Sequence, residues 1–256
     1  MNRRDFATST IAAAAATTMT RGIALSQSAA GPIKNIVMAH GLYADGSCWA
    51  DVIVRLQRAG LNVTSVQNPL TAFEDDVAAV TRALDVQDGP TVLVAHSYGG
   101  MVATQAGVHP NVTRLVYVAA RAPDAGENYT ALAGRFPAPP AAKGLVKIGN
   151  YLKLSEAAFL TDFANGVDPI KARVLFAVQQ PNVATLSPNA QTTAAAWRTK
   201  PSWYAVSKRD RTIDPDLERF MAARMKATTI EIDAGYLSLV SHAQEVADLV
   251  LEATSG

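Results

Sequence analysis

The sequence predicts an α/β fold: one mostly parallel, doubly wound sheet with helices on both faces. Short apolar runs alternate with segments of helical spacing along most of the chain, and strands that alternate with helices in this way form parallel sheets. Hydrophobic residues make up 49% of the 256 residues and charged residues 18%, so the chain can bury a core. No internal repeat or long linker divides it, which favours a single folded domain.

The charge balance and the cysteine content exclude several functions. The chain has 23 Lys and Arg against 22 Asp and Glu, a net charge of +1, which offers no electrostatic basis for binding nucleic acid or an anionic membrane. The single cysteine, Cys48, excludes an intramolecular disulfide and a cysteine-rich zinc site. No glycine-rich nucleotide motif follows a predicted strand, and no cluster has metal-ligand spacing. We therefore expect neither a cofactor nor a metal.

The N-terminal segment has the features of an export signal. Arg3 and Arg4 precede Asp5-Phe6, a mildly apolar Ala/Thr-rich stretch follows, and small residues place a cleavage site after Ser26 or Ala30. This arrangement resembles a twin-arginine signal over residues 1–30. It predicts a periplasmic or secreted protein that meets a membrane only during export, with a folded domain over residues 31–256.

The first half of this domain alternates regularly. Apolar runs predict four strands, which are Asn35–Ala39, Asn62–Val66, Thr91–Ala95 and Arg114–Ala119. Helical spacing predicts three helices between them, over Trp49–Ala59, from Thr71 to about Asp85, and from about Gly99 to Val108. Gly60 is a natural stop for the first helix, and Thr71 and Glu74 form a capping-box pattern for the second.

The alternation stops in the middle of the chain and then returns. Residues from about 123 to 200 carry prolines, glycines and short helical pieces, and we expect them to form a helical cap over one end of the sheet. Two further strands are predicted over Ser202–Val206 and Thr228–Ile232. Asp214-Pro215 is an N-cap followed by a proline in the first helical position, which predicts a helix to about Met225. The last helix is expected over Ala243–Ala253.

The motif with the clearest chemistry is a serine between a predicted strand and a helix. Ser97 follows the apolar run that ends at Ala95, and Gly99 lies two residues beyond it. A tight turn of this kind lifts a serine hydroxyl above the sheet and needs small residues on both sides. The backbone N–H of Tyr98 opens the following helix and can donate to an oxyanion. Ser97 is therefore the candidate nucleophile.

A second motif, His40-Gly41-Leu42, follows the first strand of the domain. Together with the Ser97 turn it resembles the α/β-hydrolase superfamily from about Lys34 to Ala253. The resemblance is strongest to the small esterase group that includes methyl-salicylate esterases and plant hydroxynitrile lyases. It implies that the Leu42 N–H is the second oxyanion donor, that His40 organises its loop, and that His96 packs beside the serine.

The resemblance also implies where the acid of a catalytic triad lies. In the superfamily the acid follows the serine and the histidine comes last. Asp210 occupies the acid position in the loop after the Ser202–Val206 strand. Asp214 is the competing carboxylate, but capping of the next helix already explains it. Asp210 is the predicted acid, whose function would be to orient an imidazole.

The base departs from the superfamily pattern. The histidine is expected about three or four residues after the last strand, and Tyr236 stands there. His242 lies just before the final helix and is the alternative base. A phenol with a pKa of about 10 is a poor base at neutral pH, and a nearby carboxylate would raise that pKa further.

Three interpretations remain open. His242 could reach Ser97 and complete an ordinary esterase, Tyr236 could leave a catalytically impaired ligand binder, or its hydroxyl could serve a non-hydrolytic, lyase-type reaction. The prediction is a carboxylic-ester hydrolase for a small apolar ester or acyl ligand, because the cap supplies several aromatic residues that suit such a ligand. They are Tyr129, Phe136, Tyr151, Phe159, Phe163, Phe176 and Trp197.

Overall fold

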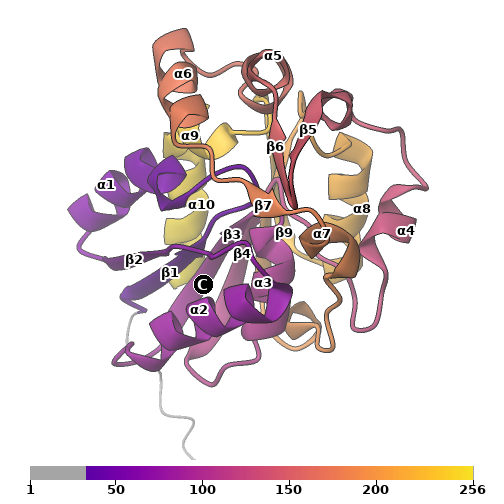
Figure 1. The fold of residues 1–256 in the computed structure, drawn as a ribbon. Coiled ribbons are helices and arrows are strands. Elements are labelled where there is room, and N and C mark those ends of the chain that lie inside the picture. The colour runs from indigo at the N-terminus through magenta and orange to yellow at the C-terminus, as the bar shows by residue number, and fades with distance from the viewer. Residues whose placement is uncertain (1–32, 256) are drawn as a thin grey trace, which may run out of the picture. The chain divides into compact units, whose positions relative to one another are not determined.

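The computed structural model describes residues 33–255 and contains a central sheet of six parallel strands (Figure 1). The strand order is β2-β1-β3-β4-β8-β9. The strands are β1 (Asn35–Ala39), β2 (Asn62–Val66), β3 (Thr91–His96), β4 (Val112–Val118), β8 (Ser202–Ser207) and β9 (Thr228–Ile232). The predicted α/β class with a doubly wound parallel sheet is confirmed.

The middle of the sheet is buried from both sides, because helices cover both of its faces. Every residue of β1 and β3 is buried, as expected for apolar runs in a parallel sheet. These two strands pair with Ala39 opposite Ala95 at their carboxyl ends. The loops that follow β1 and β3 therefore start side by side, which brings the two motifs around Gly41 and Ser97 together.

The helices cover the two faces in separate groups (Figure 1). On one face α1 (Ala50–Arg58) packs against α10 (Ala243–Ser255), which also contacts β3, β4 and β8. On the other face α2 (Phe73–Asp85) packs against α3 (Gly99–Ala106), and α8 (Pro215–Met225) contacts β8. A short helix, α9 (Ser238–Ser241), precedes α10.

Two of the three predicted helix boundaries have the expected chemistry. Gly60 follows α1 with a φ of +82°, and the Asp214 carboxylate accepts a hydrogen bond from the Asp216 N–H at 2.9 Å. The capping box predicted for α2 is wrong. Its N-cap is Ala72, which has no side chain to cap the helix, and the Thr71 hydroxyl instead donates to Asp75 at 2.7 Å.

The chain between β4 and β8 contains both helices and strands. Three short strands form an antiparallel sheet of their own in the order β5-β6-β7, which the sequence analysis did not anticipate. The elements are α4 (Tyr129–Ala133), β5 (Leu145–Ile148), β6 (Tyr151–Leu154), α5 (Glu156–Ala158), α6 (Pro169–Ala177), β7 (Asn182–Val183) and α7 (Leu186–Asn189).

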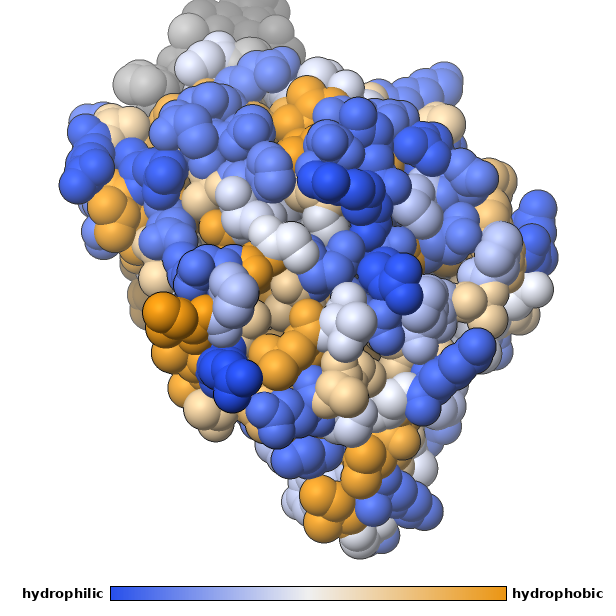
Figure 2. Space-filling view, turned by 90° about the horizontal axis from the view of Figure 1, so that it is seen from above, coloured by the Kyte–Doolittle hydropathy of each residue, from blue (hydrophilic) through white to orange (hydrophobic). Residues whose placement is uncertain are grey.

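This segment lies over the loops at the carboxyl edge of the main sheet. Phe163 contacts Tyr43 in the loop after β1, with ring centroids 6.3 Å apart, and the Ala141 N–H donates to the Arg211 carbonyl in the loop after β8 at 3.0 Å. Figure 2, a view from above, shows hydrophobic residues in separate patches among polar ones on this side. We call residues 123–200 the cap from here on.

The predicted export signal, with its cleavage site after Ser26 or Ala30, lies outside the described residues. Within residues 33–255, no helix combines the length and the hydrophobicity needed to cross a bilayer.

Candidate active site

Ser97 lies on a strained turn between β3 and α3. Its φ is +55°, in the left-handed region that residues other than glycine rarely adopt. The Ser97 carbonyl accepts hydrogen bonds from the N–H groups of Gly100 and Arg121, both at 2.9 Å. A Cβ on Gly99 would lie 2.6 Å from the Ala39 carbonyl oxygen, so only glycine fits there. The turn has the geometry that the sequence predicts for a nucleophile.

The loop after β1 passes directly over this serine. A Cβ on Gly41 would lie 2.6 Å from the Ser97 Cβ and 3.1 Å from its hydroxyl oxygen. Neither the Leu42 N–H nor the Tyr98 N–H donates to another residue in the described part of the chain. Two unpaired backbone donors beside a serine hydroxyl are what an oxyanion hole requires.

His40 fixes the shape of this loop. One of its ring nitrogens bonds the Gly41 carbonyl at 2.9 Å, and the other accepts from the Asn68 N–H at 2.9 Å. The Asn68 side-chain amide donates in turn to the His40 carbonyl at 2.9 Å. Burial lowers the pKa of His40, and both of its ring nitrogens are engaged, so the ring holds the loop and has no free nitrogen to act as a base.

The structure places Tyr236, not His242, beside the candidate nucleophile. The side chain of Tyr236 lies next to that of Ser97, close enough for the Ser97 hydroxyl to affect the pKa of the phenol. His242 lies at the junction of α9 and α10, where its ring bonds the Ser241 hydroxyl at 2.9 Å. No hydrogen bond joins it to Ser97 in the described structure, so the interpretation in which His242 completes the triad lacks support.

Aromatic packing fixes the position of Tyr236. Its ring centroid lies 4.5 Å from that of His96 and 4.8 Å from that of Phe163, which belongs to the cap. The His96 Nε2 also bonds the Tyr236 carbonyl at 3.2 Å. Burial lowers the pKa of His96 to about 3, so this second histidine beside the serine is a very weak base and serves to hold Tyr236 in place.

The chemistry of Tyr236 follows from its burial. Burial raises the pKa of the phenol above its ordinary value of 10, the neighbouring Ser97 hydroxyl opposes this rise only in part, and the Asp210 charge raises the pKa further. A neutral phenol has no tendency to take the serine proton, so it can hydrogen-bond but cannot act as a general base near neutral pH.

Asp210 occupies the predicted acid position but has an unexpected partner. Its Oδ1 accepts from the N–H groups of Thr212 and Ile213 at 2.6 and 2.9 Å. Its Oδ2 and the Oε1 of Glu218 are both buried and accept from no donor among the described residues, so the two carboxyl groups can bond only each other. The Oε2 of Glu218 accepts from the Ser207 N–H at 3.1 Å. Two carboxyl groups can share such a bond only if one of them carries a proton.

Burial raises the pKa of both carboxyl groups of this pair. Burial raises the pKa of Asp210 to about 7, whereas burial and the Asp210 charge together raise the pKa of Glu218 well above its ordinary value. The sequence analysis missed Glu218. The available signal was its place on the apolar stripe of α8, beside Leu217 and Met221, since an unpaired glutamate is rarely buried on such a stripe.

A cavity of about 200 Å³ lies next to this site, between the cap and the loops of the main sheet. Its polar residues are Tyr43, Arg121, Tyr129, Thr212 and Asp214. Its apolar wall includes Ala133, Pro137, Leu145, Leu154, Ile213 and Leu217. Ser97 is not on the wall and is only 1% exposed, so a ligand in the cavity reaches the hydroxyl only if a wall residue moves.

The described residues offer no metal site. No group of three or more His, Cys, Asp or Glu side chains within residues 33–255 could hold a metal ion.

The parallel sheet, the serine turn and the glycine loop above it define a hydrolase-type α/β protein. Comparison with known families agrees with this class. The model of the alpha/beta hydrolase family matches residues 36–249, and the chain belongs to this family.

Two of the similar curated relatives are esterases, and each of these two matches covers less than half of the relative. The chain is 32% identical over 114 residues to the carbendazim hydrolyzing esterase of Nocardioides sp. (strain SG-4G), which is 39% of this chain and 47% of that protein. It is 31% identical over 107 residues to methylesterase 7 of Arabidopsis thaliana, 36% of this chain and 41% of that protein.

Solved structures extend the likeness in fold to the whole domain. The crystal structure of polyneuridine aldehyde esterase superimposes with a TM-score of 0.75 at 17% sequence identity, covering 87% of this chain and 100% of that one. The resemblance to small esterases of the α/β-hydrolase superfamily, first drawn from the motifs around Gly41 and Ser97, is thereby confirmed.

Proposed function

We propose that the protein is a carboxylic-ester hydrolase that uses Ser97 as its nucleophile and works slowly because its triad has no competent base. The observation that carries this proposal is the position of the Ser97 hydroxyl beneath the glycine loop, next to the unpaired N–H groups of Leu42 and Tyr98. Such donors stabilise the oxyanion that forms when a serine attacks an ester carbonyl.

The proposed reaction has two steps. The Ser97 oxygen attacks the ester carbonyl, the Leu42 and Tyr98 N–H groups bind the oxyanion, and the alcohol leaves with a proton to give an acyl-serine. Water then attacks the acyl-serine and releases the acid. Each attack needs a base that removes a proton from the attacking oxygen, and Tyr236 cannot act as this base while it remains a neutral phenol. Both steps are therefore slow, and the second, in which the nucleophile is water, suffers most.

This reasoning gives a direct experiment. With p-nitrophenyl butyrate, whose leaving group needs no protonation, we expect a burst of at most one equivalent of nitrophenolate followed by very slow turnover. Intact-protein mass spectrometry should show one butyryl group that persists for minutes or longer, and Ser97→Ala should show neither burst nor adduct. Hydrolysis that is equally fast in Ser97→Ala, or that proceeds without any adduct on Ser97, would contradict the proposal.

A second candidate, ligand binding without turnover, is favoured by one specific observation. Ser97 is only 1% exposed, and the buried phenol of Tyr236 beside it cannot act as a base. In that case no acyl-serine would form with p-nitrophenyl butyrate. Butyrate or another small acyl compound would still raise the melting temperature, because a ligand that binds only the folded state stabilises it.

We further propose that the ligand is a small, largely apolar ester or acyl compound and that the protein acts outside the cytoplasm. The apolar wall of the cavity, with Leu145, Leu154 and Leu217, supports the first statement. The Arg3-Arg4 motif supports the second. Fusing residues 1–30 to a reporter should direct export in a bacterium with a twin-arginine system, and Arg3→Lys with Arg4→Lys should block it.

A further inference from the structure

Arg121 is a half-buried arginine on the cavity wall that forms no ion pair with any described residue. The nine ion pairs of the described structure engage other arginines, one lysine and His109. A guanidinium is always charged at physiological pH, and burying it even in part without an anion is unfavourable. Its position in a cavity suggests that the missing anion belongs to a ligand.

We propose that the cavity binds an acidic ester, whose ionised carboxylate pairs with Arg121 while its apolar body lies along the cap. This inference rests on the proposed esterase function, because it names the class of substrate for that same site. The carboxylate meant here is a second one, remote from the ester bond that reacts at Ser97.

The contacts of the guanidinium leave one edge free. Its Nη1 donates to the Ser187 hydroxyl at 2.8 Å, and its Cζ lies 4.9 Å from the ring centroid of Tyr129. Its Nε is buried and has no hydrogen-bond partner, and Nη2 donates to no described residue. The Nε–Nη2 edge is the one that a carboxylate can bridge with two parallel hydrogen bonds.

The backbone fixes Arg121 relative to the candidate nucleophile. The Arg121 N–H donates to the Ser97 carbonyl at 2.9 Å. A Cβ on Gly100 would lie 2.4 Å from the Arg121 carbonyl oxygen, so the two backbones are in close contact. A carboxylate held by Arg121 is therefore held within the same local framework as the Ser97 turn. An acidic ester would gain from this because binding energy at the remote carboxylate helps to position the reacting carbonyl.

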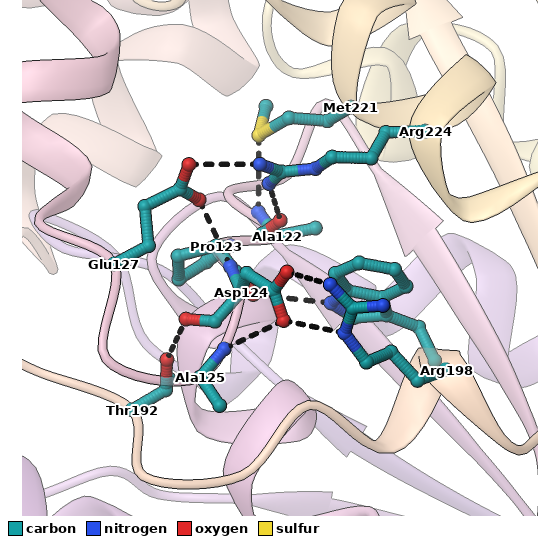
Figure 3. Close-up of polar contacts among 10 residues, drawn as sticks. Ala122, Pro123, Asp124, Ala125, Glu127, Thr192, Arg198, Met221 and Arg224 are labelled. Carbon is teal, nitrogen blue, oxygen red and sulfur yellow. Dashed lines mark hydrogen bonds and ion pairs between the residues drawn. The ribbon is translucent and has the colours of Figure 1, made fainter.

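The residues directly after Arg121 are anchored by two further arginines (Figure 3). Arg224 donates to the Ala122 carbonyl and to Glu127, both at 2.8 Å, and Arg198 pairs with Asp124. The sulfur of Met221 accepts from the Ala122 N–H at 3.2 Å. These contacts hold the start of the cap in place, so Arg121 presents its side chain from a rigid segment.

One carboxylate on the cavity wall acts against an anionic ligand. Asp214 lies there, and its Oδ1 is engaged in capping α8. It forms no ion pair with Arg121, so it does not neutralise the guanidinium. Asn caps helices as well as Asp does, so Asp214→Asn removes the charge and keeps the cap, which makes it a matched variant for the test.

The test measures binding without turnover. Isothermal titration calorimetry on Ser97→Ala compares hexanoate with hexanamide, which has nearly the same shape and no charge. We expect hexanoate to bind at least 10-fold more tightly, Arg121→Gln to remove this difference, and Asp214→Asn to increase it. Equal affinity for the two probes, or a ratio that Arg121→Gln leaves unchanged, would overturn the inference.

A parallel measurement separates this inference from the proposed function. The Ser97 acylation rates of mono-p-nitrophenyl glutarate and p-nitrophenyl pentanoate are compared in the unmutated protein. A preference for the glutarate that Arg121→Gln abolishes supports both proposals. Acylation without any preference supports the esterase and refutes the acidic ligand, whereas tight, Arg121-dependent binding of hexanoate without acylation refutes the esterase alone.

Discussion

The phenol of Tyr236 lies next to the hydroxyl of Ser97, in the position where a triad would place an imidazole. The surroundings of this pair are those of an esterase: a strained serine turn, a glycine loop above it and a buried aspartate nearby. We therefore attribute the proposed slow catalysis to one side chain, Tyr236, whose pKa is too high for it to be deprotonated and to act as a base at neutral pH.

Replacing Tyr236 by histidine should restore activity. An imidazole with a pKa of about 6.5 can accept the serine proton at neutral pH, and a positioned general base contributes about 10²–10⁴-fold. We expect Tyr236→His to raise steady-state hydrolysis of p-nitrophenyl butyrate by a factor in this range. The rate should rise with pH as the imidazole loses its proton, and stopped-flow or plate assays between pH 5 and 9 would check this.

Two controls distinguish a restored triad from a loosened site. Ser97→Ala in the Tyr236→His background should abolish the gain, and His242→Ala in that background should leave it intact because His242 bonds Ser241 elsewhere. An equal gain in Tyr236→Phe would show that removing the phenol matters more than adding a base, and the argument from the pKa would then be wrong.

The carboxyl pair of Asp210 and Glu218 should make stability depend on pH. Both groups have a higher pKa in the folded protein than in the unfolded chain, with that of Asp210 at about 7 against 3.8. The folded state therefore binds more protons between about pH 4 and 7, and the free energy of unfolding falls as the pH rises through this window. Urea denaturation at pH 5 and pH 8 measures the fall.

Glu218→Gln should reduce this fall. The amide can donate to the Asp210 Oδ2 and accept from the Ser207 N–H without a shared proton. At pH 8 we expect the variant to be more stable than the unmutated protein by about 1 kcal/mol, a difference typical of satisfying one buried polar atom. An unchanged pH dependence would mean that the pair does not share a proton.

The close approach behind the serine turn predicts a position that tolerates no side chain. A Cβ on Gly99 would lie 2.6 and 2.7 Å from the carbonyl oxygens of Ala39 and His40, which are backbone atoms. Gly99→Ala should lower the unfolding free energy by ~1–3 kcal/mol and displace the oxyanion loop. Gly89→Ala is the matched control, since nothing lies within 4 Å of its added Cβ, and it should change stability by less than about 0.5 kcal/mol.

Two arginines allow an anchoring contact to be compared with a surface ion pair. Arg224 is 20% exposed and donates to Glu127 and the Ala122 carbonyl, whereas Arg219 is 40% exposed and pairs with Glu231 on the surface. Arg224→Ala should cost about 2 kcal/mol of unfolding free energy, and Arg219→Ala less than ~1 kcal/mol. Thermal or urea unfolding measures both, and similar losses would show that Arg224 is not an anchor.

The sequence was sufficient for the main sheet and for the position of the serine. Apolar runs such as Thr91–Ala95 have one stable environment, the buried middle of a parallel sheet. The position of Tyr236 came instead from the resemblance to the superfamily, which puts a histidine at that distance from the last strand. For the strands and the serine turn the residues themselves were enough. Local pattern was enough in these cases because each strand and its following loop are set by adjacent residues.

The parts that could not be predicted depend on contacts between distant segments. All four residues of β5 (Leu145–Ile148) are exposed, so no alternation of burial marks them as a strand. The partner of Asp210 is Glu218, and their bond depends on how α8 packs under the loop that precedes it. Arg121 becomes a candidate ligand-binding residue only because it lies on the wall of a cavity that α4 and β5 also line.

The position of Tyr236 next to Ser97 has an evolutionary consequence. The codons of tyrosine and histidine differ at a single nucleotide, so one point mutation converts the described site into one with a complete Ser-His-Asp set, and one point mutation reverses it. The oxyanion donors, Asp210 and the serine turn would remain in place through either change. A single nucleotide substitution would thus be enough to turn the proposed slow ester hydrolase into a faster one.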